Sequence, residues 1–357
     1  MTRAYLNRVT TATPAHEVHG TFVSFAARFL RDRRARLLFE RMVARSQIER
    51  RWSCLAPAGP GCNESVDADG FYTLGRFPST AERMSRYEIE APRLAGAAVD
   101  RLGLGEAARD VTHLIVTSCT GFSAPGVDLE LVRRCGLDPS VERTVVGFMG
   151  CYAAITALRL ARHIVRSDPS AQVLVVSAEL CTLHLQETDD LERLLTFLLF
   201  GDGASAALVS AAPVGLALDG FNAVLVPQAA DQITWNIRDL GFDMVLSGSV
   251  PGTITDALRS GASRVLAGST ADAIGLWAVH PGGRTVLDAV EGAFGLGPSA
   301  LAASRAVLRD YGNMSSPTVM FVLDAVLRAK TPAGARGCAM AFGPGLTAET
   351  MLFSAAA

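Results

Sequence analysis

The stretch Val145-Val146-Gly147-Phe148-Met149-Gly150-Cys151-Tyr152-Ala153-Ala154 decides the fold of this 357-residue chain. A β-branched run stops at glycine, turns, and delivers a cysteine at the predicted first turn of a helix that continues to Arg162. This helix is apolar almost all round, which is typical of a helix buried in a large core. Backbone N–H groups and the helix dipole at such a start favour a thiolate, so Cys151 is a candidate nucleophile. The alternative is a packed cysteine without chemistry, because free cysteine is among the most buried residue types.

Composition narrows the class of protein. Hydrophobic residues make up 49 % and charged residues 19 % of the chain, a balance that suits an interior with several buried layers. The net charge of −2 argues against binding to nucleic acid or an anionic membrane. The first residues lack an apolar signal region, and the apolar run from Leu194 to Phe200 is too short to span a bilayer. The seven cysteines show no metal-ligand spacing, so we expect a soluble, cytoplasmic protein without a metal site.

Strand and helix patterns alternate through most of the chain. Apolar runs at residues 111–118, 172–178 and 204–209 read as strands, and residues 127–135 and 191–199 read as helices. Such alternation predicts a layered α/β architecture.

The second half of the sequence repeats the order of the first. In both halves a strand is followed by a Gly/Pro turn, a helix and a Gly-Leu motif, at residues 114–140 and again at residues 275–299. Repetition at half the chain length predicts two similar α/β halves packed together. We place their join near Asp219-Gly220, which gives halves of residues 1–219 and 220–357.

Two more polar residues follow apolar segments in glycine-rich turns. His280 precedes Pro281-Gly282-Gly283, and Asn313 lies before the apolar helix predicted at residues 318–327. Each alone is more often a structural residue than a catalytic one. The repeat, however, places His280 at the position equivalent to residues 118–120, at the end of the sheet where α/β proteins place their sites.

Cysteine, histidine and asparagine from separate loops form a chemically useful set. An imidazolium beside Cys151 would lower the pKa of the thiol and yield a thiolate nucleophile. The imidazole and the amide of Asn313 could then donate hydrogen bonds to an enolate oxygen. That set suits acyl transfer followed by decarboxylative carbon–carbon bond formation. A cysteine protease would use the same residue types, but with the asparagine orienting the histidine.

Five motifs in this order resemble the type III polyketide synthase (chalcone synthase-like) family, and its bacterial members in particular. They are Gly147-Phe148-Met149-Gly150-Cys151, Phe200-Gly201-Asp202-Gly203, Trp277-Ala278-Val279-His280-Pro281-Gly282-Gly283, Tyr311-Gly312-Asn313-Met314-Ser315-Ser316 and Phe342-Gly343-Pro344-Gly345-Leu346-Thr347. The resemblance implies a thiolase fold, with two pseudo-repeated α/β halves in a five-layered αβαβα sandwich. It also implies a homodimer and CoA thioester substrates, with no cofactor and no metal.

The resemblance assigns roles to matching positions. Cys151 would carry the starter and the growing chain, while His280 and Asn313 would polarise the malonyl thioester. Phe200 matches the gatekeeper phenylalanine between the CoA tunnel and the reaction cavity. Met244 stands where the plant enzymes have a second phenylalanine, which suggests a more deformable neck and favours aliphatic or malonyl starters.

Further positions match the substrate-binding parts of the family. Arg41 and Arg45 match residues that contact CoA phosphates, whereas a third such position is occupied by Leu38, which cannot do so. The positions that match the cavity wall are Cys119, Thr120, Cys181, His184, Leu246, Ser315, Gly343, Pro344 and Gly345. Cys119 resembles bacterial members in which a cysteine handles intermediates, and it could equally be a packing residue. His184 could steer cyclisation or only line the wall.

The expected activity is iterative condensation of malonyl-CoA onto an acyl-CoA starter, with cyclisation to a pyrone, resorcinol or related phenolic. The partners would be acyl-CoA and malonyl-CoA, with no acyl carrier protein required. A fatty-acid-initiating ketoacyl-ACP synthase shares Cys, His and Asn and remains an alternative. A non-catalytic acyl-binding relative is the alternative of another class.

Overall fold

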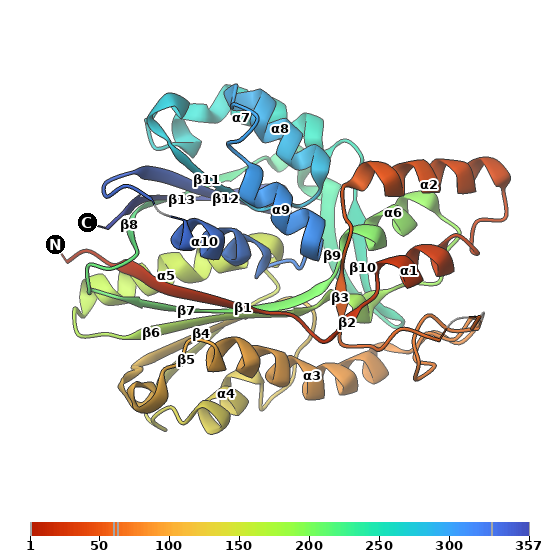
Figure 1. The fold of residues 1–357 in the computed structure, drawn as a ribbon, viewed down its shortest axis with the longest axis horizontal. Coiled ribbons are helices and arrows are strands. Elements are labelled where there is room, and N and C mark those ends of the chain that lie inside the picture. The colour runs from red at the N-terminus through yellow and green to blue at the C-terminus, as the bar shows by residue number, and fades with distance from the viewer. Residues whose placement is uncertain (1, 60, 63, 330, 357) are drawn as a thin grey trace.

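The computed structural model describes residues 2–356 with the exception of 60, 63 and 330. Figure 1 shows two stacked sheets with helices between them and on both outer faces. The layers therefore alternate helix, sheet, helix, sheet, helix, which confirms the predicted αβαβα sandwich.

The N-terminal sheet has the strand order β1-β7-β6-β4-β5. Strands β4, β5 and β6 are parallel, while β7 and β1 complete the sheet in antiparallel pairing. The bounds are β1 Tyr5–Ala12, β4 His113–Ser118, β5 Glu142–Gly147, β6 Val173–Leu180 and β7 Asp202–Ser210.

The C-terminal sheet has the order β8-β13-β12-β11, with β11 and β12 parallel. Its strands are β8 Leu216–Leu225, β11 Leu276–Val279, β12 Arg336–Gly343 and β13 Thr347–Ala355. Strands β1, β7, β6 and β4 thus correspond in order and direction to β8, β13, β12 and β11, as the internal repeat predicts. The two sheets are continuous, because Tyr5 pairs with Ala217 and Leu6 with Leu216, so β1 and β8 link all nine strands into one hydrogen-bonded order. The join proposed at residues 219/220 falls inside β8, and the exact division of the chain stays a prediction.

Helices α5 and α10 form the central layer. In α5, Ala153–Ser167, the alanines at 153, 157 and 161 are fully buried, and the buried residues of α10 extend over nearly its whole length, Thr318–Arg328. Helices α3 (Thr80–Asp100) and α4 (Val127–Cys135) cover the N-terminal sheet, and α7 (Val250–Val265) and α8 (Arg284–Phe294) cover the other (Figure 1). Helix α9, Ala302–Tyr311, packs against α8 and α10.

Smaller elements gather at one end of the sandwich (Figure 1). They are α1 His19–Ala26, α2 Arg33–Ser46, α6 Leu191–Leu199 and the hairpin of β9 Ile233–Arg238 and β10 Gly241–Leu246. A two-residue pairing of β2 His16–Glu17 with β3 Trp52–Ser53 ties the N-terminal segment to this end. Helix α2 ends at Ser46, because the next residue, Gln47, takes a left-handed φ of 60°.

Candidate active site

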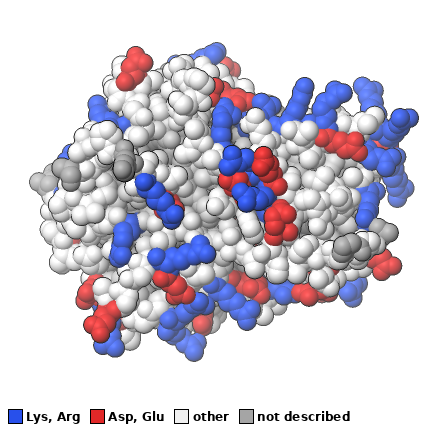
Figure 2. Space-filling view, viewed as in Figure 1, with Lys and Arg blue, Asp and Glu red and all other residues white. Residues whose placement is uncertain are grey.

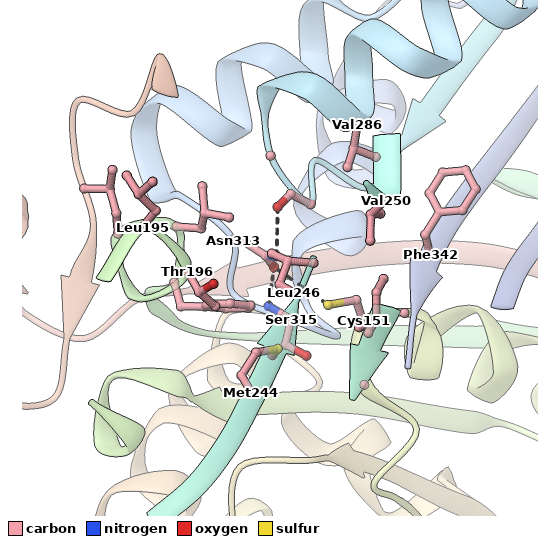
Figure 3. A pocket seen from close by; sticks show the side chains of 18 of the residues that line it. Cys151, Leu195, Thr196, Met244, Leu246, Val250, Val286, Asn313, Ser315 and Phe342 are labelled. Carbon is pink, nitrogen blue, oxygen red and sulfur yellow. Dashed lines mark hydrogen bonds between the residues drawn. The ribbon is translucent and has the colours of Figure 1, made fainter. Parts of the chain in front are cut away.

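A cavity of about 390 Å³ lies where the parallel strands end. Cys119 follows β4, Cys151 follows β5, Cys181 follows β6 and His280 follows β11, so the carboxyl ends of four strands supply its wall. Figure 3 shows the thiol of Cys151 and the side chain of Asn313 pointing into this space. The repeat explains the convergence, because α5 and α10 are equivalent helices and Cys151 and Asn313 each lie just before one of them.

The turn that carries Cys151 is held in an unusual backbone conformation. Phe148 and Gly150 have positive φ angles of 58° and 71°, and Gly150–Tyr152 form a single 3₁₀ turn before α5. A Cβ atom on Gly150 would lie 2.4 Å from Cδ of Pro344, so only glycine fits there. The close approach of the residue 343–345 loop fixes the position of the thiol.

Burial controls the protonation of Cys151. It raises the pKa of the thiol to about 11, although hydrogen bonding to Ser315 and Asn313 lowers it in part. Burial also lowers the pKa of His280 to about 3, and neither ring nitrogen of His280 has a hydrogen-bond partner. Burial therefore disfavours the predicted thiolate–imidazolium pair, because desolvation of both groups opposes the effect of the helix N-terminus. Both groups are neutral at pH 7.

Asn313 is oriented by its neighbours. Its Oδ1 accepts from the backbone N–H of Ser315 at 2.8 Å and lies 4.0 Å from Sγ of Cys151. Its Nδ2 donates to the carbonyl of Gly282 at 3.3 Å, next to the His280 turn. One amide hydrogen of Nδ2 remains for a ligand. The Asn313 backbone also bonds the segment that bears Phe200, since its N–H donates to the carbonyl of Leu199 and its carbonyl accepts from Gly201.

Most of the sequence-predicted residues line this one cavity. Besides Cys151, His280 and Asn313, the wall includes Phe200, Met244, Cys119, Thr120, Cys181, His184, Leu246, Ser315, Gly343, Pro344 and Arg45. Gly345 does not line it; its backbone N–H donates to the carbonyl of Ile233 at 2.9 Å. Arg41 also lies outside the wall, on the exposed side of α2.

Comparison with known proteins gives a consistent result. The model of the chalcone and stilbene synthase N-terminal domain matches residues 3–213, and that of the C-terminal domain matches residues 219–357. The chain belongs to this family. It is a type III polyketide synthase.

Individual relatives of this polyketide synthase come from distant organisms. The bisdemethoxycurcumin synthase of rice is 38 % identical over 315 residues, which cover 82 % of this chain and 76 % of the rice protein. The α-pyrone synthesis polyketide synthase-like Pks18 of Mycobacterium tuberculosis is 35 % identical over 297 residues, covering 79 % and 76 % of the two chains.

Solved structures agree with the fold. PKS-I of the brown alga Ectocarpus siliculosus superposes with a TM-score of 0.86 at 29 % identity over 99 % of each chain. The type III domain of Steely1 from Dictyostelium gives 0.89 at 23 % identity, over 99 % of this chain and 100 % of that domain.

His184 of this polyketide synthase is locked into the wall. Its Nε2 donates to the carbonyl of Thr120 at 2.7 Å, and its Nδ1 accepts from the N–H of Phe242 at 3.1 Å. The ring stacks on Phe242 with centroids 4.1 Å apart, and burial lowers its pKa to about 3. Backbone groups occupy both ring nitrogens, which favours a role in the wall over a role in steering cyclisation.

Glu179 lies directly behind the wall, and sequence reasoning missed it. Its carboxylate accepts from the N–H of Cys119 at 2.9 Å and from the hydroxyls of Thr120 at 2.7 Å and Ser316 at 2.6 Å. Burial raises its pKa, and its charge in turn raises the pKa of Cys151. A carboxylate in the apolar run of residues 172–181 was the detectable signal, because such a residue is almost never fully buried unless it is bonded.

Trp235 and Arg284 also line the cavity without having been predicted. The indole N–H of Trp235 donates to the carbonyl of Cys119 at 2.6 Å, which fastens the β9-β10 hairpin over the wall. Arg284 begins α8 and donates to the carbonyl of Arg45 at 2.8 Å and to Asp288 at 2.7 Å. No sequence signal marked Trp235, since either face of its strand could have met the cavity.

The described residues provide no metal site and no membrane span. No group of three or more His, Cys, Asp or Glu among them is placed to hold a metal ion. None of the described helices is both long and apolar enough to cross a bilayer.

Proposed function

We propose that Cys151 takes an acyl group from CoA and that His280 and Asn313 support its extension with malonyl-CoA. One observation carries this proposal: the three residues come from separate loops and line one cavity of about 390 Å³. A cavity of that size suits a small cyclic polyketide, so we propose a pyrone, resorcinol or related phenolic as the product.

Acylation begins with proton transfer from the Cys151 thiol to a ring nitrogen of His280, which has no other partner. The thiolate attacks the acyl carbon of the CoA thioester, the new C–S bond forms, and the C–S bond to CoA breaks. The CoA thiolate takes the proton back from the imidazolium and leaves. His280 is then neutral again.

Decarboxylation uses hydrogen-bond donors on Asn313 and His280. The free amide hydrogen of Asn313 and an N–H of His280 point to the thioester carbonyl oxygen of malonyl-CoA. The bond to the carboxylate breaks, CO₂ leaves, and the electron pair becomes an enolate that the donors stabilise. The enolate carbon attacks the acyl group on Cys151 and releases its thiolate. Each such donor is typically worth ~10²–10³ in rate.

Other predicted residues shape this chemistry. We infer that Phe200 and Met244 form the neck of the cavity, with Met244 making it adaptable to aliphatic or malonyl starters. Arg45 and Arg41 would bind CoA phosphates, and neither guanidinium has a carboxylate partner among the described residues. The enzyme would need no cofactor and no acyl carrier protein, and would work in the cytoplasm of a bacterium.

We also propose a homodimer. Strand β5 is an unpaired edge, with Val145 53 % exposed, and Phe122 beside it is 44 % exposed. The ring of Phe122 lies 5.3 Å from that of Phe148, so a continuous apolar patch borders the edge. Exposed edges of this kind are usually covered in a native protein.

The test is incubation with malonyl-CoA and a panel of starter CoAs, without carrier protein. We expect CO₂ release and an acyl adduct on the intact protein, with the adduct absent in Cys151→Ala. His280→Ala should retain some acylation but lose ~10²–10³ of the decarboxylation rate. An adduct that survives in Cys151→Ala would show that the nucleophile is misassigned, and absence of CO₂ release would refute the proposed reaction.

A further inference from the structure

Arginines without a carboxylate partner gather on α2 and the turn before it. Elsewhere many exposed arginines form ion pairs, such as Arg133 with Glu130 at 3.0 Å and Arg328 with Asp324 at 2.9 Å. Among the described residues, no carboxylate pairs with any of Arg31, Arg33, Arg34, Arg36, Arg41 and Arg45. Figure 2 shows the resulting cluster of positive charge over α2, at the upper right. These positive charges repel one another, so binding of a negatively charged partner would reduce the repulsion between them.

One face of α2 connects this surface to the active site. Residues 34, 38, 41 and 45 are spaced by four, three and four positions, which places them along one side of a helix. We name Arg34, Leu38, Arg41 and Arg45 the α2 stripe. Arg45 lines the cavity together with Met42, so the stripe runs outward from the cavity mouth. Arg34 lies about 16 Å from Arg45 along the helix axis.

Apolar side chains interrupt the charge. Leu37 is 55 % exposed, Leu38 43 % and Met42 38 %, while Phe39 on the opposite face is fully buried. Exposed apolar residues flanked by arginine are typical of the centre of a protein–protein interface. A phosphate gains nothing from Leu38, whereas an apolar side chain of a partner protein does.

We propose that the α2 stripe docks a small acidic carrier protein that presents an acyl thioester on a phosphopantetheine arm. This rests on the proposed function and adds a second starter donor to CoA. The arm shares its pantetheine and one phosphate with CoA, so Arg45 and Arg41 bind that phosphate at the mouth. Arg34 is too distant to share it and pairs with acidic side chains of the carrier. Leu38 and Met42 contact apolar side chains between the two charged regions.

Acyl transfer from the carrier protein forms and breaks the same kinds of bond as acylation from CoA. The acyl carbon gains a bond to Sγ of Cys151 and loses its bond to the sulfur of the phosphopantetheine arm. The proton of the Cys151 thiol ends on the arm, which leaves with the carrier as a free thiol. No oxidant or further reactant is needed.

The experiment compares two donors of one acyl group on the full-length enzyme. Octanoyl-CoA and the octanoyl-loaded holo acyl carrier protein of fatty acid synthesis supply the thioester, and the Cys151 adduct is followed by intact mass. We expect Arg34→Glu to lower kcat/KM for the carrier-borne acyl group at least tenfold and to change that for octanoyl-CoA less than twofold. Arg109→Glu, an equal charge reversal at an exposed site away from α2, should change neither. Added salt should weaken the reaction with the carrier protein, because exposed charge pairs are screened.

Three results would overturn the proposal. The first is acylation by octanoyl-CoA without any from the carrier. The second is an equal loss with both donors in Arg34→Glu, which would make the stripe part of the CoA site. The third is loss of cosedimentation with phosphatidylserine vesicles in Arg34→Glu without loss of carrier kinetics, which would assign the surface to a membrane. If neither thioester acylates Cys151, the proposed function itself fails and this inference falls with it.

Discussion

Desolvation governs the chemistry of this site at the scale of single residues. Cys151 and His280 are both neutral because each is enclosed by protein, and the few groups that counteract burial act on the thiol alone. The residues themselves were predictable, since Cys151, His280 and Asn313 occupy turns whose glycines mark them in the sequence. Their protonation was not, because the pKa of a buried group depends on everything packed around it.

Ser315 has a measurable effect on the thiol. Its hydrogen bond favours the thiolate of Cys151, so Ser315→Ala should raise the pH midpoint of Cys151 alkylation by iodoacetamide, followed by peptide mass spectrometry. Residue 315 has a positive φ of 58°. Serine and alanine both carry a Cβ atom, so the substitution leaves the backbone strain at this position unchanged. Ser247→Ala at the cavity mouth is the control and should leave the midpoint unchanged. An unchanged or lower midpoint in Ser315→Ala would contradict the role of this hydroxyl.

At the scale of elements, local signals fixed the helices better than the wall of the cavity. The helices predicted at residues 127–135 and 191–199 have those bounds in the structure, because Gly136 and Asp190 cap them. Local signals do not fix the β9-β10 hairpin in the same way. Its register and the face it turns to the cavity depend on Trp235 and Phe242 packing around His184, contacts between segments distant in the sequence.

The hairpin should limit the size of the product. Trp235→Ala removes an indole from the cavity wall and its hydrogen bond to Cys119, so we expect more malonyl extensions or longer accepted starters. Trp235→Phe keeps most of the bulk without the N–H and should change the product range much less. Product mass spectrometry across starter lengths measures both variants. Identical product ranges in Trp235→Ala and the parent would show that Trp235 does not bound the cavity.

The whole molecule places its site through the pairing of two similar halves. The repeat was visible in the sequence because both halves use the same order of turn and helix signals. Stacking then brings Cys151 before α5 and Asn313 before α10 to one cavity. What the sequence could not specify is the surface chemistry of the assembled molecule, such as the exposed edge of β5, because exposure exists only after the strands are ordered.

The exposed edge of β5 predicts that the protein forms a dimer. Val145→Lys places a charge on the exposed edge and should shift the mass in analytical ultracentrifugation from dimer toward monomer, since charges at an edge discourage pairing. Val214→Lys, at an equally exposed position before β8, is the matched control and should leave the dimer intact. A parent protein that sediments as a monomer, or a Val145→Lys dimer of unchanged stability, would contradict the proposed interface.

Stability of the whole chain should fall in mild acid. Burial lowers the pKa of His184 and His280 to about 3, whereas an unfolded histidine titrates near 6.5, so the unfolded chain binds more protons as pH falls. The stabilising contribution is therefore complete above pH 6.5 and is lost between pH 6.5 and 3, by up to ~1.4 kcal/mol per pH unit for each histidine. Asp202, whose pKa burial raises to about 6, acts in the opposite direction and offsets part of the loss.

The variant His184→Gln isolates the contribution of one histidine to this pH dependence. His184→Gln removes one titrating group from the wall, so its free energy of unfolding should depend less steeply on pH, by about 1 kcal/mol per unit between pH 6 and 4. At pH 7 the variant should be less stable by about 1–3 kcal/mol, because the stacked ring and its two hydrogen bonds are lost. Urea titrations at several pH values measure both quantities. Parallel pH profiles for variant and parent would mean that His184 has the same pKa in the folded and the unfolded protein, which would contradict the effect of burial on this ring.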